Sequence, residues 1–245
     1  MSITKGKNSN ILVSDSGLEG LCIEIGSGFS KINIEGEHII AEAGAYLSLV
    51  AKEAMLGCLT GFEFAAGIPG SVGGAMVMNA GAYGNEMKDI VHKVTVFDLD
   101  SKKILELSNS DMEFGYRSSI VKNRNYVVLS AEFCLSKGDE KSIKDKMNDL
   151  AVRRREKQPL EYPSAGSTFK RPIGFFAGKL IEESGLKGYS VGGAQVSEKH
   201  AGFVINKNNA QAIDIYRLIC EVKEKVFADS GVRLETEVIL LGDFS

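Results

Sequence analysis

The chain has 245 residues, of which 44% are hydrophobic and 25% charged, and its formal net charge at pH 7 is −3. These values are typical of a globular protein and exclude intrinsically disordered chains. The small negative charge gives no bulk attraction to nucleic acid, and no apolar run approaches the roughly 20 residues of a transmembrane helix. Because the first residues also lack the apolar core of a signal peptide, we expect a cytoplasmic protein that binds neither nucleic acid nor a membrane.

The first half of the chain is predicted to be mainly sheet with one helix beside it. Runs rich in β-branched residues, separated by glycine-containing turns, predict a meander over residues 21–25, 30–34 and 38–41. The helical spacing of Leu47, Val50 and Ala54 predicts a helix that ends near Gly57. Later β-rich runs predict further strands over residues 91–97, 102–107 and 126–134.

The pattern changes near residue 138, which we take as the boundary between a domain of residues 1–138 and one of residues 139–245. Beyond it, Ile143, Met147 and Leu150 fall on one face of a predicted helix. The basic run at residues 153–157 follows this helix, and it fits either a solvated helix face or a cationic rim for a phosphorylated substrate.

The last helix is the clearest in the sequence. Its apolar stripe runs from Ile215 to Val226, and we expect Asn208 or Asn209 to cap its start and Gly231 to end it. A final strand is predicted over residues 235–241.

Four cysteines lie far apart in the sequence among apolar neighbours: Cys22, Cys58, Cys134 and Cys220. The chain has no Cys-x-x-Cys pair, and neither a His-Glu-x-x-His motif nor another clustered ligand spacing argues for a metal. We therefore expect buried free thiols and no metal site.

Glycine is concentrated in residues 67–84, where Gly67, Gly70 and Gly73 recur at every third position. The spacing matches neither a Rossmann turn nor a phosphate-binding loop of the Gly-x-x-x-x-Gly-Lys-Ser/Thr type. Such a segment either packs very tightly or lies against a flat or anionic ligand. We predict that it is a cofactor loop.

Two polar motifs each allow two interpretations. The short side chains of residues 8–10 suit an ordinary turn, or a cluster of donors around an anion. Arg117 follows two aromatic residues and is suited either to a surface salt bridge or to bidentate binding of a carboxylate.

Two later motifs carry hydroxyl and carboxylate groups. Residues 163–172 place two serines between prolines with cations directly behind them, but a serine hydrolase is disfavoured because the Gly-x-Ser-x-Gly elbow and an evident base are missing. Glu235 and Glu237 would share one face of a strand, where they border a cavity or lie on a solvated edge.

These motifs, in this order, resemble one family, the UDP-N-acetylenolpyruvoylglucosamine reductases of peptidoglycan precursor synthesis. The strongest elements are residues 67–74, 78–84, 116–117, 164–169 and 234–238. The resemblance implies an α+β fold, in which a flavin-binding domain of the vanillyl-alcohol oxidase type, with its N-terminal lobe largely missing, precedes a smaller α+β substrate-binding domain. It also implies FAD and NADPH, and reduction of UDP-N-acetylglucosamine enolpyruvate to UDP-N-acetylmuramate.

The resemblance further implies roles for individual residues. Ser167 would donate a proton to the carbanion-like carbon, with Lys170 supporting its acidity, while Arg117 and Glu237 stabilise the charge that develops. The cofactor would be bound by Gly6, Lys7, Asn8, Ser9, Asn10, Gly67, Ile68, Pro69, Gly70, Ser71, Gly73, Gly74, Asn79, Ala80, Gly81 and Tyr83. The substrate would be bound by Tyr116, Lys170, Arg171, Gln195, Lys199 and His200, although surface or packing roles stay open for the last four.

Three departures from the family pattern are visible. Members normally carry a further small βαβ lobe before the Gly6 region, and they usually have glycine where Asn8 stands, although asparagine tolerates left-handed backbone well. About 50 residues separate Arg117 from Ser167, which resembles the compact branch that lacks a substrate-covering tyrosine loop. Besides an active reductase we therefore keep the alternative of an impaired fragment that only binds the UDP-sugar; the oligomeric state is left open.

Overall fold

The computed structural model describes residues 2–244, which form two compact units. The large unit contains residues 2–7 and 21–154, and the small unit contains residues 8–20 together with the chain from residue 155 onwards. The units therefore divide between Arg154 and Arg155, whereas we placed the domain boundary at residue 138. An N-terminal segment also belongs with the C-terminal part of the chain, which no local pattern indicates.

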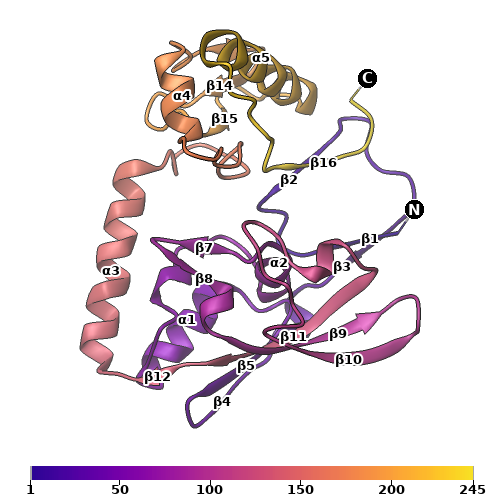
Figure 1. The fold of residues 1–245 in the computed structure, drawn as a ribbon, viewed down its shortest axis with the longest axis vertical. Helices are drawn as coiled ribbons and strands as arrows, with labels where there is room; N and C mark the ends of the chain where they lie inside the picture. Colours follow the sequence, from indigo (N-terminus) through magenta and orange to yellow (C-terminus); the bar gives the residue numbers. More distant parts are fainter. Residues whose placement is uncertain (1, 245) are drawn as a thin grey trace. The chain divides into compact units, whose positions relative to one another are not determined.

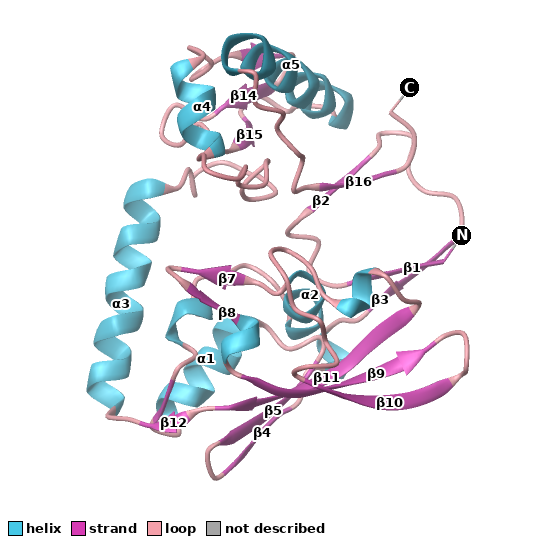
Figure 2. Cartoon of the chain, viewed as in Figure 1, coloured by secondary structure: helices cyan, strands magenta, loops and turns pink. Residues whose placement is uncertain are grey.

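The large unit is built on a five-stranded antiparallel sheet with the strand order β10-β9-β11-β5-β4 (Figures 1 and 2). The predicted strands of this sheet are confirmed. Their bounds are β4 Ile32–Glu35, β5 His38–Glu42, β9 Val91–Asp98, β10 Lys103–Ser108 and β11 Tyr126–Cys134.

The predicted three-stranded meander is wrong, because only β4 and β5 pair as a hairpin. Strand β3 (Leu21–Glu24) pairs in parallel with β1 (Ser2–Lys5) in a separate two-stranded sheet. All four β3 side chains are exposed, so this strand has no apolar face that would hold it against the main sheet.

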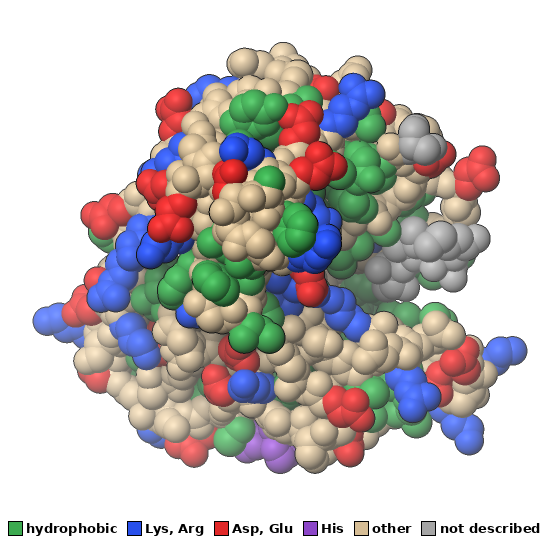
Figure 3. Space-filling view, turned by 45° about the horizontal axis from the view of Figure 1, so that its top comes forward, with side chains coloured by type: hydrophobic (Ala, Val, Ile, Leu, Met, Phe, Trp, Pro, Cys, Tyr) green, Lys and Arg blue, Asp and Glu red, His purple; other side chains and the backbone are tan. Residues whose placement is uncertain are grey.

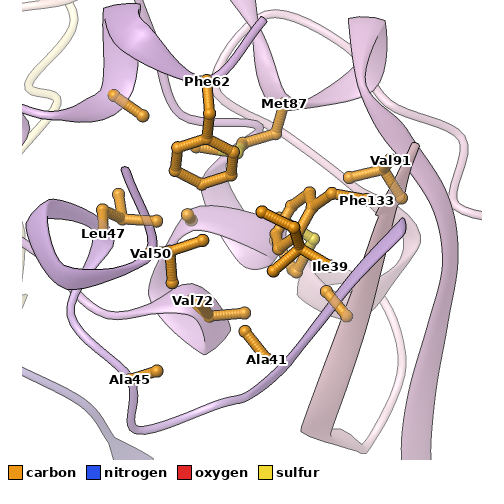
Figure 4. Packing of buried hydrophobic residues seen from close by; sticks show 14 of the residues in the cluster. Ile39, Ala41, Ala45, Leu47, Val50, Phe62, Val72, Met87, Val91 and Phe133 are labelled. Carbon is orange, nitrogen blue, oxygen red and sulfur yellow. The ribbon is translucent and has the colours of Figure 1, made fainter. Parts of the chain in front are cut away.

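The core of the large unit lies between the sheet and two helices, α1 (Leu47–Leu56) and α2 (Val72–Met78). Figure 4 shows Phe62 and Phe133 at its centre, and their rings meet edge to face at 5.0 Å between centroids. Helix α1 ends at Gly57, as predicted. The short elements of this unit are β6 Leu59–Thr60, β7 Gly81–Ala82, β8 Asn85–Glu86, β12 Ser136–Lys137, and the 3-10 helices Ser27–Phe29, Glu63–Ala65, Met87–Asp89 and Ile120–Lys122.

The small unit packs two helices with an antiparallel sheet of three short strands. The helices are α4 Ala177–Glu183 and α5 Ala212–Ser230, and the strands are β13 Ser190–Val191, β14 Ala194–Val196 and β15 Val204–Asn206. A second pairing is parallel: β2 (Ile11–Val13) lies beside β16 (Ile239–Leu241). The predicted final strand is therefore shorter than residues 235–241.

The predicted caps of α5 are partly wrong. Gln211 is the N-cap, and it forms a capping box with Asp214 in place of Asn208 or Asn209. The carboxylate of Asp15 adds two acceptors, for the N–H groups of Ala212 at 2.9 Å and Ile213 at 3.1 Å. At the other end Gly231 adopts the left-handed conformation, with φ of 71°, as predicted.

The prediction for the cysteines is correct in one respect and wrong in another. All four are free thiols, but Cys22 and Cys134 are exposed, and Cys58 and Cys220 are only partly buried. Cys134 lies at the end of β11, where the neighbouring Phe133 points to the opposite, buried face, whereas Cys22 lies on β3, whose four side chains are all exposed. Among residues 2–244, no helix is long and apolar enough to cross a membrane. Positive and negative side chains are interspersed over the face drawn in Figure 3.

A buried carboxylate ties the long helix α3 (Glu140–Lys157) to the large unit. Glu63 is 2% exposed, accepts hydrogen bonds from the Thr60 hydroxyl at 2.5 Å and the Gly61 N–H at 2.9 Å, and lies 3.3 Å from the Lys146 ammonium. Burial acts to raise the pKa of Glu63, but these hydrogen bonds and Lys146 outweigh it, so the pKa is lowered below 4.5.

We predict that Glu63→Gln lowers the free energy of unfolding at pH 7 by about 1–3 kcal/mol, because the substitution removes a buried charge-assisted network. A carboxyl with a lowered folded-state pKa stabilises the fold above its ordinary pKa, and this contribution is lost as the pH falls through the folded-state value. Urea unfolding should show the difference from wild type shrinking below pH 4.5. The exposed Glu35→Gln is the control, and an equal loss there would contradict the account.

Candidate functional site

The predicted site residues divide between the two units. The large unit contains Gly6, Lys7, the glycine-rich segment, Tyr116 and Arg117. The small unit contains residues 8–10, Ser167, Glu237 and the remaining substrate-contact candidates. The geometry is therefore described within each unit.

The glycine-rich segment folds as a turn, a helix and a second turn. Ser71 caps α2, and its side chain accepts from the Gly74 N–H at 3.5 Å. The Gly73 N–H donates to the Ala43 carbonyl at 2.8 Å, and a Cβ on Gly73 would lie 3.0 Å from the Ala43 Cβ. Glycine at this position thus permits close packing of α2 on the end of β5, which was one of the two interpretations of the segment.

Gly6 and Lys7 lie against the start of α2. A Cβ on Gly6 would lie only 2.6 Å from the Ser71 hydroxyl, so only glycine fits there without displacing that group. The Lys7 ammonium donates to the Tyr46 hydroxyl at 2.9 Å, and Tyr46 forms a β-bridge with Ser71. Two of the predicted cofactor-binding segments are therefore adjacent in the large unit.

Asn79 is fully buried, and its side chain is bonded within the protein. Its amide nitrogen donates to the Glu86 carboxylate at 2.9 Å and to the Gly115 carbonyl at 3.0 Å, while its oxygen accepts from the Lys88 N–H at 3.0 Å. The side chain thus fixes the turn that carries Tyr116 and Arg117. A direct contact between Asn79 and the cofactor stays a prediction. Such a contact would have to be made by the main chain of Asn79.

Arg117 lies in a tight turn closed by the Gly115–Ser118 bridge, with φ of 54°. Its carbonyl accepts from the Lys122 ammonium at 3.1 Å, and its guanidinium carbon lies 5.4 Å from the centroid of the Tyr116 ring. A left-handed backbone at a residue other than glycine is uncommon and marks this turn as a candidate functional feature.

The basic run at residues 153–157 is not uniformly a solvated helix face. Arg153 is exposed and pairs with Asp149 at 2.9 Å. Arg154 is partly buried, burial lowers the pKa of its guanidinium, and a Cβ on Gly67 would lie 3.3 Å from its Cδ. Arg154 therefore packs against the glycine-rich segment, which sequence reasoning missed.

Ser167 and Glu237 lie on two extended segments that are joined by backbone hydrogen bonds. Phe169 and Thr236 form an antiparallel bridge, and the Glu237 N–H donates to the Thr168 carbonyl at 2.8 Å. Ser167 is exposed, whereas Glu237 is partly buried. The structure therefore brings together these two predicted catalytic residues, which are 70 positions apart in the chain.

Thr168 is a buried support that sequence reasoning missed. Its N–H donates to the Gly202 carbonyl at 2.9 Å, and its hydroxyl accepts from the Val204 N–H at 2.9 Å. A polar residue between Ser167 and the buried Phe169 was the available signal, since a buried hydroxyl requires a partner.

The charge of Lys170 is engaged by a carboxylate. Its ammonium donates to Glu235 at 2.8 Å, and this hydrogen bond lowers the pKa of Glu235. The role of Lys170 in supporting Ser167 stays a prediction, and it requires that Lys170 be shared with or released from Glu235.

The residue 8–10 segment also reaches Glu237. Asn8 has φ of 60°, which is a left-handed backbone conformation. This fits a position where the family usually has glycine. The Asn10 amide donates to the Glu237 carbonyl at 3.2 Å, and the Asn10 carbonyl accepts from the Ile239 N–H at 3.0 Å. Through Asn10, this segment is thus joined to Glu237, whose N–H is bonded to Thr168 beside Ser167.

The other substrate-contact candidates are held by contacts inside the small unit. The Gln195 amide donates to the Gly188 carbonyl and the Ser190 hydroxyl, both at 3.1 Å. Lys199 donates to the Arg155 carbonyl at 2.7 Å. The Arg171 guanidinium lies 4.0 Å from the centroid of the Phe176 ring. Each of these three residues thus has a contact within the small unit, and substrate binding by them stays a prediction.

His200 is held as a neutral imidazole. Burial lowers its pKa, and the nearby Lys187 and Lys157 act in the same direction, while Glu182 opposes them. The Nδ1 atom accepts from the Gly202 N–H at 3.1 Å, so the ring proton lies on Nε2. His200 is therefore a hydrogen-bond donor through Nε2.

Comparison with known proteins assigns both parts of the chain. A family model described as "FAD binding domain" matches residues 2–108, and one described as "UDP-N-acetylenolpyruvoylglucosamine reductase, C-terminal domain" matches residues 158–241. Proteins named UDP-N-acetylenolpyruvoylglucosamine reductase from Caldanaerobacter subterraneus and Clostridioides difficile are 53% and 54% identical to the chain; each match covers 97% of the chain and 78% of the relative.

The chain belongs to the UDP-N-acetylenolpyruvoylglucosamine reductase family. A crystal structure of such a reductase from Thermus caldophilus superposes with a TM-score of 0.87 at 32% identity, covering 98% of this chain and 85% of that one. The resemblance and the fold class that we predicted are thereby confirmed. As a member of this family, the protein is an oxidoreductase of peptidoglycan synthesis, and its FAD-binding domain is followed by the family's C-terminal domain.

The residues around Gly6 fit the chemistry of FAD. Because Gly6 lies close to Ser71, the Gly6 backbone, the Ser71 hydroxyl and the Lys7 ammonium lie near one another. These groups are suited to binding a diphosphate. Larger side chains would fill this space, as the 2.6 Å distance for a Cβ on Gly6 shows.

We predict that Gly6→Ala and Ser71→Ala couple. The new methyl group must displace the Ser71 hydroxyl that caps α2, and loss of such a cap costs about 0.5–2 kcal/mol. In the Ser71→Ala background the Gly6→Ala substitution should therefore cost less, which urea unfolding of the double-mutant cycle measures. Gly28→Ala, where a Cβ meets open space, is the control. Additive effects would count against this packing.

We predict that His200 titrates below its ordinary pKa of 6.5. Because the unfolded state then binds more protons near pH 6, the residue destabilises the fold as the pH falls below 6.5. Histidine ring NMR should show the low pKa and a proton on Nε2, with His200→Gln used for assignment. A pKa at or above 6.5 would contradict the buried, neutral imidazole.

Proposed function

We propose that this protein catalyses the FAD-dependent, NADPH-driven reduction of UDP-N-acetylglucosamine enolpyruvate to UDP-N-acetylmuramate. The observation that carries the proposal is the cluster of Ser167, Glu237 and residues 8–10 on hydrogen-bonded segments of the small unit. A hydroxyl, a carboxylate and a candidate cofactor segment are the groups that this reduction requires in one place.

When bound and reduced by NADPH, the flavin supplies the hydride that reduces the enolpyruvyl double bond. The protein's task is then to add one proton and to stabilise negative charge on the substrate. The exposed Ser167 hydroxyl is the proposed proton donor. The neighbouring Thr168 is fixed by its hydrogen bonds to Gly202 and Val204, so the backbone that carries this hydroxyl is held in place before the reaction.

Arg117 and Glu237 are proposed to stabilise the developing charge. The guanidinium of Arg117 would bind the substrate carboxylate bidentately, a task for which the turn fixed by Asn79 preorganises it. The backbone N–H and carbonyl of Glu237 are both hydrogen-bonded, so its main chain is held on both sides.

Binding of the two large ligands is assigned to separate sets of residues. Gly6, Lys7, residues 8–10 and the glycine-rich segment would hold FAD, with the Lys7 ammonium and the Ser71 hydroxyl as polar groups beside Gly6. In the small unit, Lys199 and Arg171 would bring positive charge to the UDP moiety, and His200 would donate through Nε2.

We predict that Ser167→Ala keeps FAD binding and reduction of the flavin by NADPH, but slows reoxidation of the flavin by the enolpyruvyl substrate by about 10²–10⁴-fold. Stopped-flow absorbance at the flavin band, in separate half-reactions, measures both steps. Ser48→Ala on the exposed surface of α1 is the matched control.

Two results would overturn the proposal. If wild-type protein does not bind FAD but binds the UDP-sugar in a calorimetric titration, the chain is a binding module. If Ser167→Ala reoxidises as fast as wild type, the proton comes from another group.

A further inference from the structure

We propose that the Asn10 side chain is a positioning group for Glu237, and not a ligand of the cofactor as the resemblance of its segment implies. The inference rests on the proposed function, because it assigns Asn10 to the half-reaction in which Glu237 acts. Its basis is a pair of hydrogen bonds within the small unit that join Asn10 to residues 237–239.

Asn10 contacts the Glu237 segment through both its side chain and its main chain. The side-chain amide donates to the Glu237 carbonyl at 3.2 Å, and the main-chain carbonyl accepts from the Ile239 N–H at 3.0 Å. The next residue begins the parallel pairing of β2 with β16, in which Ile11 lies opposite Ile239. Asn10 therefore sits at the point where that pairing ends, and its amide extends the pairing by one peptide group.

Glu237 is held on its other side by the segment that follows Ser167. Its N–H donates to the Thr168 carbonyl at 2.8 Å. Thr168 is in turn fixed by Gly202 and Val204. The N–H of Glu237 is thus bonded next to the proposed proton donor, and its carbonyl is bonded to the proposed cofactor segment.

Removal of the Asn10 side-chain amide would remove only one of the two hydrogen bonds between Asn10 and residues 237–239. Without it the Glu237 carbonyl loses its side-chain partner, while the Ile239–Asn10 backbone bond and the β2–β16 pairing remain. The strand would stay paired, but the Glu237 carboxylate would be less precisely placed, and small misplacements lower the rate of a positioned reaction. Cofactor binding, which the proposed function assigns mainly to Asn8 and the Gly6 region, should be nearly unaffected.

The test compares Asn10→Ala with Asn10→Asp in the full chain. Asn10→Asp keeps the size of the side chain but replaces the donor with a carboxylate that repels the Glu237 carbonyl. Three quantities are measured for each variant: the FAD dissociation constant from flavin fluorescence, the rate of flavin reduction by NADPH, and the rate of reoxidation by the enolpyruvyl substrate. Asn208→Asp, an exposed position of the small unit, controls for the change in charge.

A double-mutant cycle with Glu237→Gln separates positioning from a general loss of structure. If Asn10 acts through Glu237, Asn10→Ala should slow reoxidation by about tenfold, the rate equivalent of a lost hydrogen bond, in the wild-type background. In the Glu237→Gln background it should have little further effect. The FAD dissociation constant and the reduction rate should stay within about threefold in both backgrounds.

The alternative results are distinguishable. A rise of about tenfold or more in the FAD dissociation constant, or an equal slowing in both backgrounds, would overturn the role of Asn10 while leaving the proposed function intact. If the FAD-loaded wild-type protein is not reoxidised by the substrate at all, the proposed function fails first and the inference fails with it.

Discussion

The parallel pairing of β2 with β16 is the constraint on which the small unit depends. Parallel strands require a crossover connection, and here the crossover is almost the whole chain, from Val13 to Ile239. The pairing is extended at one end by the bonds of Asn10 and at the other by the Ser14 N–H, which donates to the Leu241 carbonyl at 2.8 Å. Asp15 then caps α5, so an N-terminal segment is fixed to the C-terminal unit at three successive places.

The candidate site residues are positioned by backbone hydrogen bonds more than by ion pairs. Ser167 and Glu237 are placed by main-chain hydrogen bonds through Thr168, and Arg117 is placed by a turn that the buried Asn79 holds. Within the small unit, Lys170 is paired with Glu235, and burial favours the neutral form of His200. A site with these features is preorganised, which favours stabilisation of charge that develops during a reaction.

The sequence was informative where the signal was local. The five main strands follow from β-rich runs and α1 from the helical spacing of its apolar residues, and the glycine, arginine, serine and glutamate motifs identify the family. Most errors concern contacts between segments that are not neighbours in the sequence: β3 joins β1, Asp15 caps α5, and residues 8–20 join the C-terminal unit. The missed N-cap Gln211 is a local error, because its capping box with Asp214 lies within one helical turn. No window of sequence shows that Asp15 meets a helix 197 positions later. The apolar neighbours of Cys134 and Cys22 in the sequence were misleading for different reasons: Phe133 occupies the opposite, buried face of β11, and the neighbours of Cys22 on β3 are themselves exposed.

The central claim is that Ser167, Glu237 and the residue 8–10 segment form the part of the reductase site that the small unit contributes. A crystal structure of the protein with FAD and the enolpyruvyl substrate tests it most directly. The account predicts the Ser167 hydroxyl and the Glu237 carboxylate at the enolpyruvyl group, with the Asn10–Glu237 hydrogen bond intact. Substrate bound away from Ser167, or Asn10 turned from Glu237 onto the flavin, would contradict it.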